Sequence, residues 1–162
     1  MMRAYIGIGS NIEPERHVPQ VIRLLEQCFR TIILSPVYRC EAIGFDGPDF
    51  VNLVVGVDTE LEPLALAQTL RDLEAECGRD RNQPGDSRTM DLDLLLYGDL
   101  ISDHPALRLP RDDIHRYDFV LRPLADIAAA ERHPQTGQTF AQMWQSWTGD
   151  RANLRPAGLK LA

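Results

Sequence analysis

Residues 91–97 read Asp-Leu-Asp-Leu-Leu-Leu-Tyr, and this stretch completes the series of elements that decides the fold. Alternating acidic and apolar residues that run into a short apolar segment are typical of a strand with one face in a core. Earlier in the chain, β-branched and aromatic residues predict strands at 3–9, 31–38 and 50–58. Helices between them give the order β-α-β-β-α-β. This order predicts an α+β fold of the ferredoxin-like sandwich type, a four-stranded antiparallel sheet with helices on one face.

The two helices of this order begin near Pro14 and Pro63, because proline is favoured in the first turn of a helix. In each helix, apolar residues recur three and four positions apart, as they do on one buried face. Two further helices are predicted around 119–129 and 140–147, as C-terminal additions to the sandwich. The second face of the sheet is then free for a ligand and is partly covered by the C-terminal segment.

The composition bounds the class of protein. The chain has 162 residues, of which 44% are hydrophobic and 25% charged, so we expect one soluble domain over 1–162. No apolar run approaches the roughly 20 residues that cross a bilayer, and the first residues lack a signal-peptide pattern, so a cytoplasmic protein is expected. The net charge of -7 argues against nucleic-acid binding. We expect a monomer that binds small molecules and neither nucleic acid nor membrane.

Asp91 and Asp93 form the first candidate site. Side chains alternate along a strand, so both carboxylates point to the same face, with Cα atoms about 6.6 Å apart. Magnesium favours such an arrangement, because it takes one or two carboxylates and completes its shell with water and phosphate oxygens. The alternative is that both aspartates face solvent on an amphipathic strand, and the aspartates alone leave both interpretations open.

Three arginines precede these aspartates in a polar loop: Arg79, Arg81 and Arg88. Guanidinium groups match phosphate oxygens through planar, bidentate hydrogen bonds. Cations beside a magnesium-binding carboxylate pair are typical of phosphoryl transfer, where charge spreads over phosphate oxygens. A solvated loop that keeps the protein soluble is the alternative.

Asn52 and two aromatic residues indicate where a flat heterocycle could bind. Asn52 lies two residues after Phe50 and therefore faces the same side of its strand. Its amide offers a donor and an acceptor to a ring edge. Phe50 and Phe119 either pack in the core or enclose that ring. The residues alone therefore predict a phosphotransferase that depends on magnesium and a nucleotide.

Six blocks of the sequence match one known family in the same order: 4–11, 35–39, 48–52, 78–81, 87–98 and 119–124. The most specific block is Arg88-Thr89-Met90-Asp91-Leu92-Asp93-Leu94, which fits the pattern R-x-x-D-[LIV]-D-[LIVM]. Over nearly its whole length the chain resembles the 6-hydroxymethyl-7,8-dihydropterin pyrophosphokinases of folate synthesis. The resemblance implies a ferredoxin-like fold and transfer of the β,γ-pyrophosphoryl group of ATP to the pterin hydroxymethyl oxygen, which leaves AMP.

The resemblance also implies a role for each matching residue. Two Mg²⁺ ions would be held by Asp91 and Asp93. The catalytic residues would be Arg79, Arg81, Arg88 and Asp93. The pterin would be bound by Ile43, Phe50, Asn52 and Phe119. ATP, the co-substrate, would be bound by Glu74, Arg79, Arg88, Leu94, Arg111 and Arg116.

Two positions and one segment depart from the family pattern. Arg111 stands where the family usually has histidine, Tyr117 stands where it usually has arginine, and residues 80–90 contain no tryptophan. Arg111 and Arg116 are expected to supply charge to the triphosphate instead. An alternative is a non-catalytic or weakly active paralogue that binds pterin or nucleotide. The aspartate pair and the three loop arginines speak against it, because a pure binder has no need of a magnesium pair.

Overall fold

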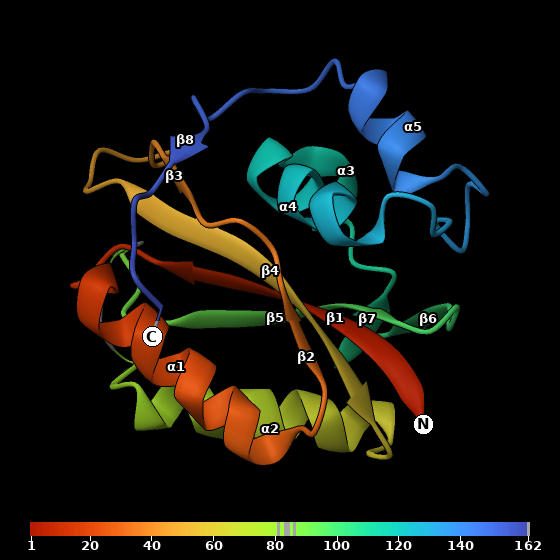
Figure 1. The fold of residues 1–162 in the computed structure, drawn as a ribbon, viewed down its shortest axis with the longest axis horizontal. Helices are drawn as coiled ribbons and strands as arrows, with labels where there is room; N and C mark the ends of the chain where they lie inside the picture. The colour runs from red at the N-terminus through yellow and green to blue at the C-terminus, as the bar shows by residue number, and fades with distance from the viewer. Residues whose placement is uncertain (81, 83–84, 86, 162) are drawn as a thin grey trace.

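The computed structural model describes residues 1–80, 82, 85 and 87–161. Within this part of the chain, one antiparallel sheet of six strands forms the centre of the molecule (Figure 1). Five strands lie in spatial order as β5 (Asp91–Tyr97), β1 (Met2–Ser10), β4 (Phe50–Thr59), β3 (Tyr38–Cys40) and β8 (Arg155–Pro156). The sixth strand, β2 (Ile32–Leu34), pairs with another part of β4. A separate hairpin is formed by β6 (Ser102–His104) and β7 (Leu107–Leu109).

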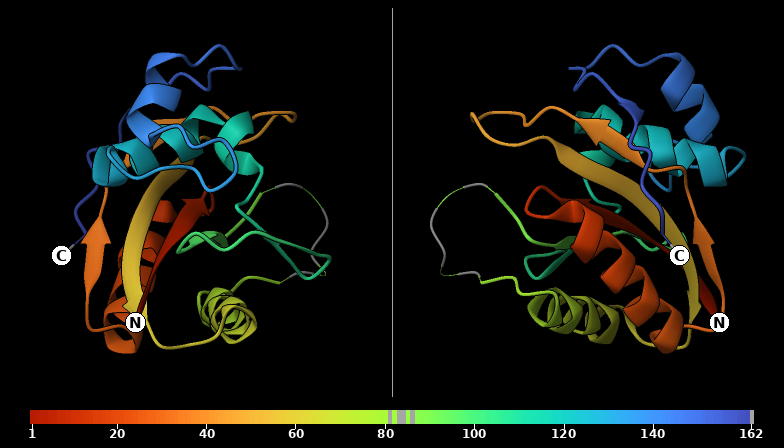
Figure 2. Two further views of the ribbon diagram at one scale, coloured as in Figure 1. Left: turned by 90° about the vertical axis from the view of Figure 1, so that its right-hand side faces the viewer. Right: turned by 60° about the vertical axis from the view of Figure 1, so that its left-hand side comes forward.

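Helices cover both faces of the sheet (Figures 1 and 2). One face carries α1 (Pro14–Cys28) and α2 (Pro63–Glu76). The other carries α3 (Asp113–Arg116), α4 (Asp118–Ala128) and α5 (Phe140–Gln145). Each face has its own apolar core, so the central strands are buried on both sides.

The alternation along β5 divides its side chains between the two cores. Leu92 and Leu94 pack in the core under α1 and α2, whereas Leu95 packs in the core under α4. Asp91 and Asp93 alternate with the first pair and therefore lie on the α4 face of the sheet. The fold thus directs both carboxylates toward the face that the α3–α5 additions only partly cover.

The α+β class with an antiparallel sheet is confirmed, but the details of the sheet differ from the prediction. The expected strand 31–38 is divided into β2 and β3, because Pro36 has no N–H to donate to the ladder. Ser35 bridges the gap: its N–H donates to the Val54 carbonyl at 2.9 Å, and its hydroxyl accepts from the Val54 N–H at 2.9 Å. The strand β8 was not predicted, and together with this division it gives the described sheet six strands instead of four.

In the described residues, no helix combines the length and the apolar character needed to cross a membrane.

Candidate active site

Two pockets meet at the carboxylates of β5. The first, here the sheet pocket, has a volume of about 260 Å³ and is lined by Gly9, Phe50, Asn52, Tyr117 and Phe119 among others. The second, here the hairpin pocket, has a volume of about 480 Å³ and is lined by residues of α2, β5 and the β6–β7 hairpin. Asp91, Asp93 and Arg111 line both pockets. A molecule in one pocket would therefore lie next to a molecule in the other.

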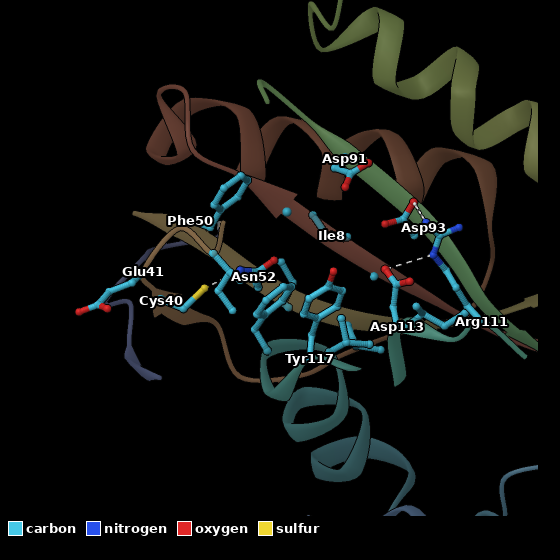
Figure 3. A pocket seen from close by; sticks show the side chains of 18 of the residues that line it. Ile8, Cys40, Glu41, Phe50, Asn52, Asp91, Asp93, Arg111, Asp113 and Tyr117 are labelled. Carbon is cyan, nitrogen blue, oxygen red and sulfur yellow. Dashed lines mark hydrogen bonds and ion pairs between the residues drawn. The ribbon is translucent and has the colours of Figure 1, made fainter. Parts of the chain in front are cut away.

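The sheet pocket is a slot with an amide on its floor (Figure 3). Asn52 is 7% exposed, and its Nδ2 donates to the Sγ of Cys40 at 2.9 Å. Burial raises the pKa of Cys40 to about 12, so the thiol accepting this bond is neutral. A Cβ at position 9 would lie 2.9 Å from the Asn52 Oδ1, so only glycine leaves room for the amide there. The orientation of Asn52 is therefore set by both neighbours.

Aromatic rings form two walls of this slot. Phe50 contacts Phe45 edge-on, with ring centroids 6.2 Å apart. On the opposite side, Tyr117 stacks on Phe119 at 4.9 Å between centroids. The four pterin residues expected from the sequence, Ile43, Phe50, Asn52 and Phe119, all line the sheet pocket. Tyr117 lines it as well, and its only signal in the sequence was its departure from the family pattern.

The hairpin pocket is rich in arginine. Arg79 and Arg88, both expected to bind nucleotide, line it together with Arg71, Arg108 and Arg111, and Leu94 contributes to its apolar wall. Arg71 and Arg108 come from α2 and β7, which only the folded chain brings beside the aspartates. The Arg81 prediction falls on a residue outside those that the structure describes. Arg116, also expected to bind nucleotide, lines neither pocket; its guanidinium lies over the Tyr117 ring, 5.4 Å from the centroid.

Asn11 holds the C-terminal end of the arginine loop in place, a role that was not predicted from the sequence. Its Oδ1 accepts from the Arg88 N–H at 2.7 Å, and its own N–H donates to the Arg88 carbonyl at 3.0 Å. Asn11 is 3% exposed and directly follows β1. The backbone of Arg88 is therefore held against the end of the central strand β1.

The carboxylates of Asp91 and Asp93 lie close to each other and to further charged side chains. Burial raises the pKa of Asp93 to about 7, the charge of Asp91 adds to the effect, and the charge of Arg111 opposes it. Arg111 lies between carboxylates, with its Nη2 3.6 Å from Asp93 Oδ1 and its Nε 3.3 Å from Asp113 Oδ2. The side chains of Asp91 and Asp93 are 37% and 27% exposed. Two close, accessible carboxylates at the junction form a site suited to a hard cation.

The donor set fits magnesium. The described residues contain no cluster of three or more acidic, histidine or cysteine side chains that could enclose a metal ion. Magnesium does not require one, because it binds through one or two carboxylates and takes its remaining ligands from water and substrate phosphates. Asp91 and Asp93 supply these carboxylates, and the arginine-lined pocket beside them has the charge to receive phosphates.

Glu74 lies beneath this site and does not line either pocket. It is 2% exposed, and its Oε2 accepts from Arg79 Nη1 at 2.9 Å and from the Leu92 N–H at 2.8 Å. The same Arg79 nitrogen donates to Asp91 Oδ1 at 2.9 Å. Glu74 therefore acts on the site through Arg79 and Leu92, and the nucleotide contact expected of it remains a prediction.

We expect Glu74→Ala to lower the free energy of unfolding by about 2–3 kcal/mol, since a buried N–H loses an ionised acceptor and Arg79 loses a close carboxylate. The thermal midpoint should fall by roughly 4–12 °C, as measured by calorimetry. Glu76→Ala is the matched control, because Glu76 lies on the same helix with an exposed side chain. Equal midpoints for the two variants would contradict the supporting role of Glu74.

Comparisons with known proteins show the family of this chain. Residues 5–129 match the family model described as 7,8-dihydro-6-hydroxymethylpterin-pyrophosphokinase. A 2-amino-4-hydroxy-6-hydroxymethyldihydropteridine pyrophosphokinase of Pseudomonas aeruginosa is 38% identical over 138 residues, which are 83% of this chain and 85% of that protein. Proteins of the same name from Haemophilus influenzae and Bacillus subtilis are 38% and 32% identical, covering 80% and 90% of this chain and 83% and 92% of their own lengths. The chain therefore belongs to the 7,8-dihydro-6-hydroxymethylpterin-pyrophosphokinase family.

Proposed function

We propose that this chain transfers pyrophosphate from ATP to 6-hydroxymethyl-7,8-dihydropterin, giving AMP and the pterin diphosphate for folate synthesis. Family membership and the names of the relatives support the reaction, and a more distant relative from Schizosaccharomyces pombe is named a folic acid synthesis protein. The observation that carries the proposal is the meeting of the two pockets at Asp91 and Asp93. Two substrates must meet there for a group to pass between them.

The pterin is assigned to the sheet pocket. The Asn52 amide is buried on its floor, and the aromatic walls at Phe50 and at Tyr117–Phe119 suit a flat ring. Ile43, 38% exposed at the rim, is placed to offer backbone contacts from its loop. With the ring between these walls, the hydroxymethyl group of the pterin would point toward the carboxylates of Asp91 and Asp93.

ATP is assigned to the hairpin pocket, where Arg71, Arg79, Arg88, Arg108 and Arg111 surround the space beside the aspartates. Guanidinium groups bind phosphate oxygens and stabilise the charge that develops on them during transfer. Because Arg111 lines both pockets, we assign it to the phosphoryl group that is transferred. Arg81 is proposed as a further catalytic arginine from the sequence alone.

Asp91 and Asp93 would hold Mg²⁺, and we propose two ions. When bound, magnesium neutralises phosphate charge and orients the phosphates for in-line displacement. The pterin hydroxyl oxygen attacks the β-phosphorus and forms the new P–O bond. The bond from the β-phosphorus to the oxygen that it shares with the α-phosphorus breaks, AMP leaves, and the hydroxyl proton is released. The residues of the chain position both substrates, and the arginines stabilise the transferred charge.

We also propose a ferredoxin-like fold, a monomeric state and a cytoplasmic location. The order β5–β1–β4 with β2 and β3 at the next position, and two helices on one face, fits a ferredoxin-like core that β8 extends. We propose a single domain over 1–162 and a monomer. A cytoplasmic location follows from the need for ATP.

The test is AMP release from ATP and Mg²⁺, with and without 6-hydroxymethyl-7,8-dihydropterin, with the pterin product identified by mass spectrometry. Pterin-dependent AMP and a product heavier by one pyrophosphoryl group are expected. Tight pterin binding without AMP would favour the non-catalytic paralogue, which the departures at Arg111 and Tyr117 motivate. Failure to bind pterin would contradict the proposed substrate.

Asn52→Ala is expected to raise the KM for pterin by about ten- to a hundredfold, because the ring edge loses a buried hydrogen-bonding partner worth roughly 1.5–3 kcal/mol. The KM for ATP should change less than about twofold, since Asn52 lines only the sheet pocket. Steady-state kinetics with each substrate varied in turn measures both values. A change of equal size for both substrates would contradict the assignment of the two pockets.

A further inference from the structure

The C-terminal segment 151–157 is bonded to residues in or next to two walls of the sheet pocket, but none of its own residues line that pocket. Figures 1 and 2 show this segment running beside β3, at the side of the sheet away from β5. Ala152 is 1% exposed and joins two distant parts of the chain. Its carbonyl accepts from the Glu41 N–H at 2.9 Å, and its N–H donates to the Asp118 Oδ2 at 3.0 Å. One residue thus connects the start of the 41–49 loop to the first residue of α4.

Both ends of this connection adjoin residues of the sheet pocket. Asp118 lies between Tyr117 and Phe119, which form one aromatic wall, while its own carboxylate points away to Ala152. Glu41 and Cys40, which accepts the hydrogen bond from Asn52, also line the pocket and form a further wall, here the Cys40–Glu41 wall. The bridge from Asp118 through Ala152 to Glu41 therefore connects this wall with the Tyr117–Phe119 wall.

Further contacts of the same segment hold both ends of the 41–49 loop. In the pairing of β3 with β8, Arg39 lies opposite Arg155, and the Ala157 N–H donates to the Val37 carbonyl at 3.0 Å. Arg155 forms an ion pair with Asp49, the residue before Phe50. The loop is open at Gly44, where a Cβ would meet no atom within 4 Å.

The carboxylate of Asp118 is an unusual group for a purely structural contact. Asp118 is 2% exposed, and its Oδ1 has no hydrogen-bond partner among the described residues. Burying a carboxylate oxygen without a partner opposes folding. The contact that the carboxylate provides here is the hydrogen bond that its Oδ2 accepts from the Ala152 N–H.

We propose that Asp118 is a positioning residue for the pterin site, which through Ala152 fixes the distance between the Tyr117–Phe119 wall and the Cys40–Glu41 wall. This inference rests on the proposed function, because it assigns the sheet pocket to the pterin. Asp118 acts through the backbone and does not touch the ring. Its loss should therefore weaken pterin binding and leave the hairpin pocket, and ATP binding, largely unchanged.

The test compares Asp118→Ala with Asp118→Asn. Asp118→Asn keeps an oxygen that can accept from the Ala152 N–H, so its Kd and KM for pterin should stay within about twofold of those of the unmodified chain. Asp118→Ala should raise both values about tenfold. The KM for ATP should stay within about twofold in both. Hydrogen exchange of the 41–45 amides, measured without substrates, should become faster in Asp118→Ala and not in Asp118→Asn.

Two controls separate positioning from general stability. Thr139→Ala removes the side-chain cap of α5 and lowers stability away from the pocket, so it should leave the Kd for pterin unchanged. If Asp118→Ala does not fold, Arg155→Ala loosens the Asp49 end of the same loop and should raise the Kd for pterin by about threefold.

An unchanged Kd for pterin in Asp118→Ala, with or without faster exchange, would overturn the positioning role. A failure of the proposed function has a different signature: the unmodified chain would not bind pterin, whatever the exchange of the 41–45 amides. Faster exchange in that case would support the bridge through Ala152 while overturning its assignment to a pterin site.

Discussion

Asp93→Ala is expected to lose at least about a hundredfold in kcat and to keep its fold, because electrostatic stabilisation of transferred charge is commonly the largest catalytic contribution. Asp93 lies at the junction of the two pockets, where it and Asp91 are the carboxylates placed to hold magnesium. Burial and the charge of Asp91 both disfavour the ionised form of Asp93 without metal. Removing this carboxylate should therefore not weaken the apo fold.

The measurement is initial velocity at saturating ATP and pterin over a range of Mg²⁺ concentrations, with the thermal midpoint as the check on folding. Asp99→Ala is the matched control, since Asp99 is exposed in the turn after the same strand and should turn over normally. Normal turnover by Asp93→Ala would refute the metal assignment. A large fall in the thermal midpoint would contradict the view that Asp93 serves catalysis rather than stability.

Arg111→Ala is expected to lower kcat/KM for ATP by about a hundred- to a thousandfold, the usual cost of removing one group that stabilises transition-state charge. The Arg111 guanidinium lies between Asp93 and Asp113 and lines both pockets. It is thus placed where phosphate charge passes from one substrate to the other. Most of the loss should appear in kcat, because this interaction is strongest during transfer.

Arg108→Ala provides the comparison within the same chain. Arg108 lines only the hairpin pocket, and it is exposed on β7. We expect less than about a tenfold rise in the KM for ATP and little change in kcat, as for a solvent-exposed charge contact. Equally small effects of Arg108→Ala and Arg111→Ala in steady-state kinetics would contradict the special position of Arg111.

The parts of the site that follow from local periodicity could be predicted from the sequence. Strand alternation alone places Asp91 and Asp93 on one face, and Phe50 and Asn52 on one side of their strand. Pro36 also marked a break within the strand expected at 31–38, a signal that the prediction did not use.

Other features depend on contacts between distant segments and have no local signature. The sequence shows Glu74 as one acidic residue on a helix; its burial follows from the packing of α2 on β5. Arg71 and Arg108 reach the hairpin pocket only because α2 and β7 lie beside the same strand. Ala152 carries no pattern at all, and the two residues of β8 are too few to show a strand period.

The central claim is that the pterin and ATP occupy the two pockets and meet at Asp91 and Asp93. The most direct measurement is a crystal structure of the chain with Mg²⁺, a non-hydrolysable ATP analogue and 6-hydroxymethyl-7,8-dihydropterin. The expected result is the pterin between Phe50 and the Tyr117–Phe119 wall, the triphosphate among the arginines of the hairpin pocket, and magnesium bound by both aspartates. A nucleotide bound elsewhere, or magnesium bound without either aspartate, would contradict the account.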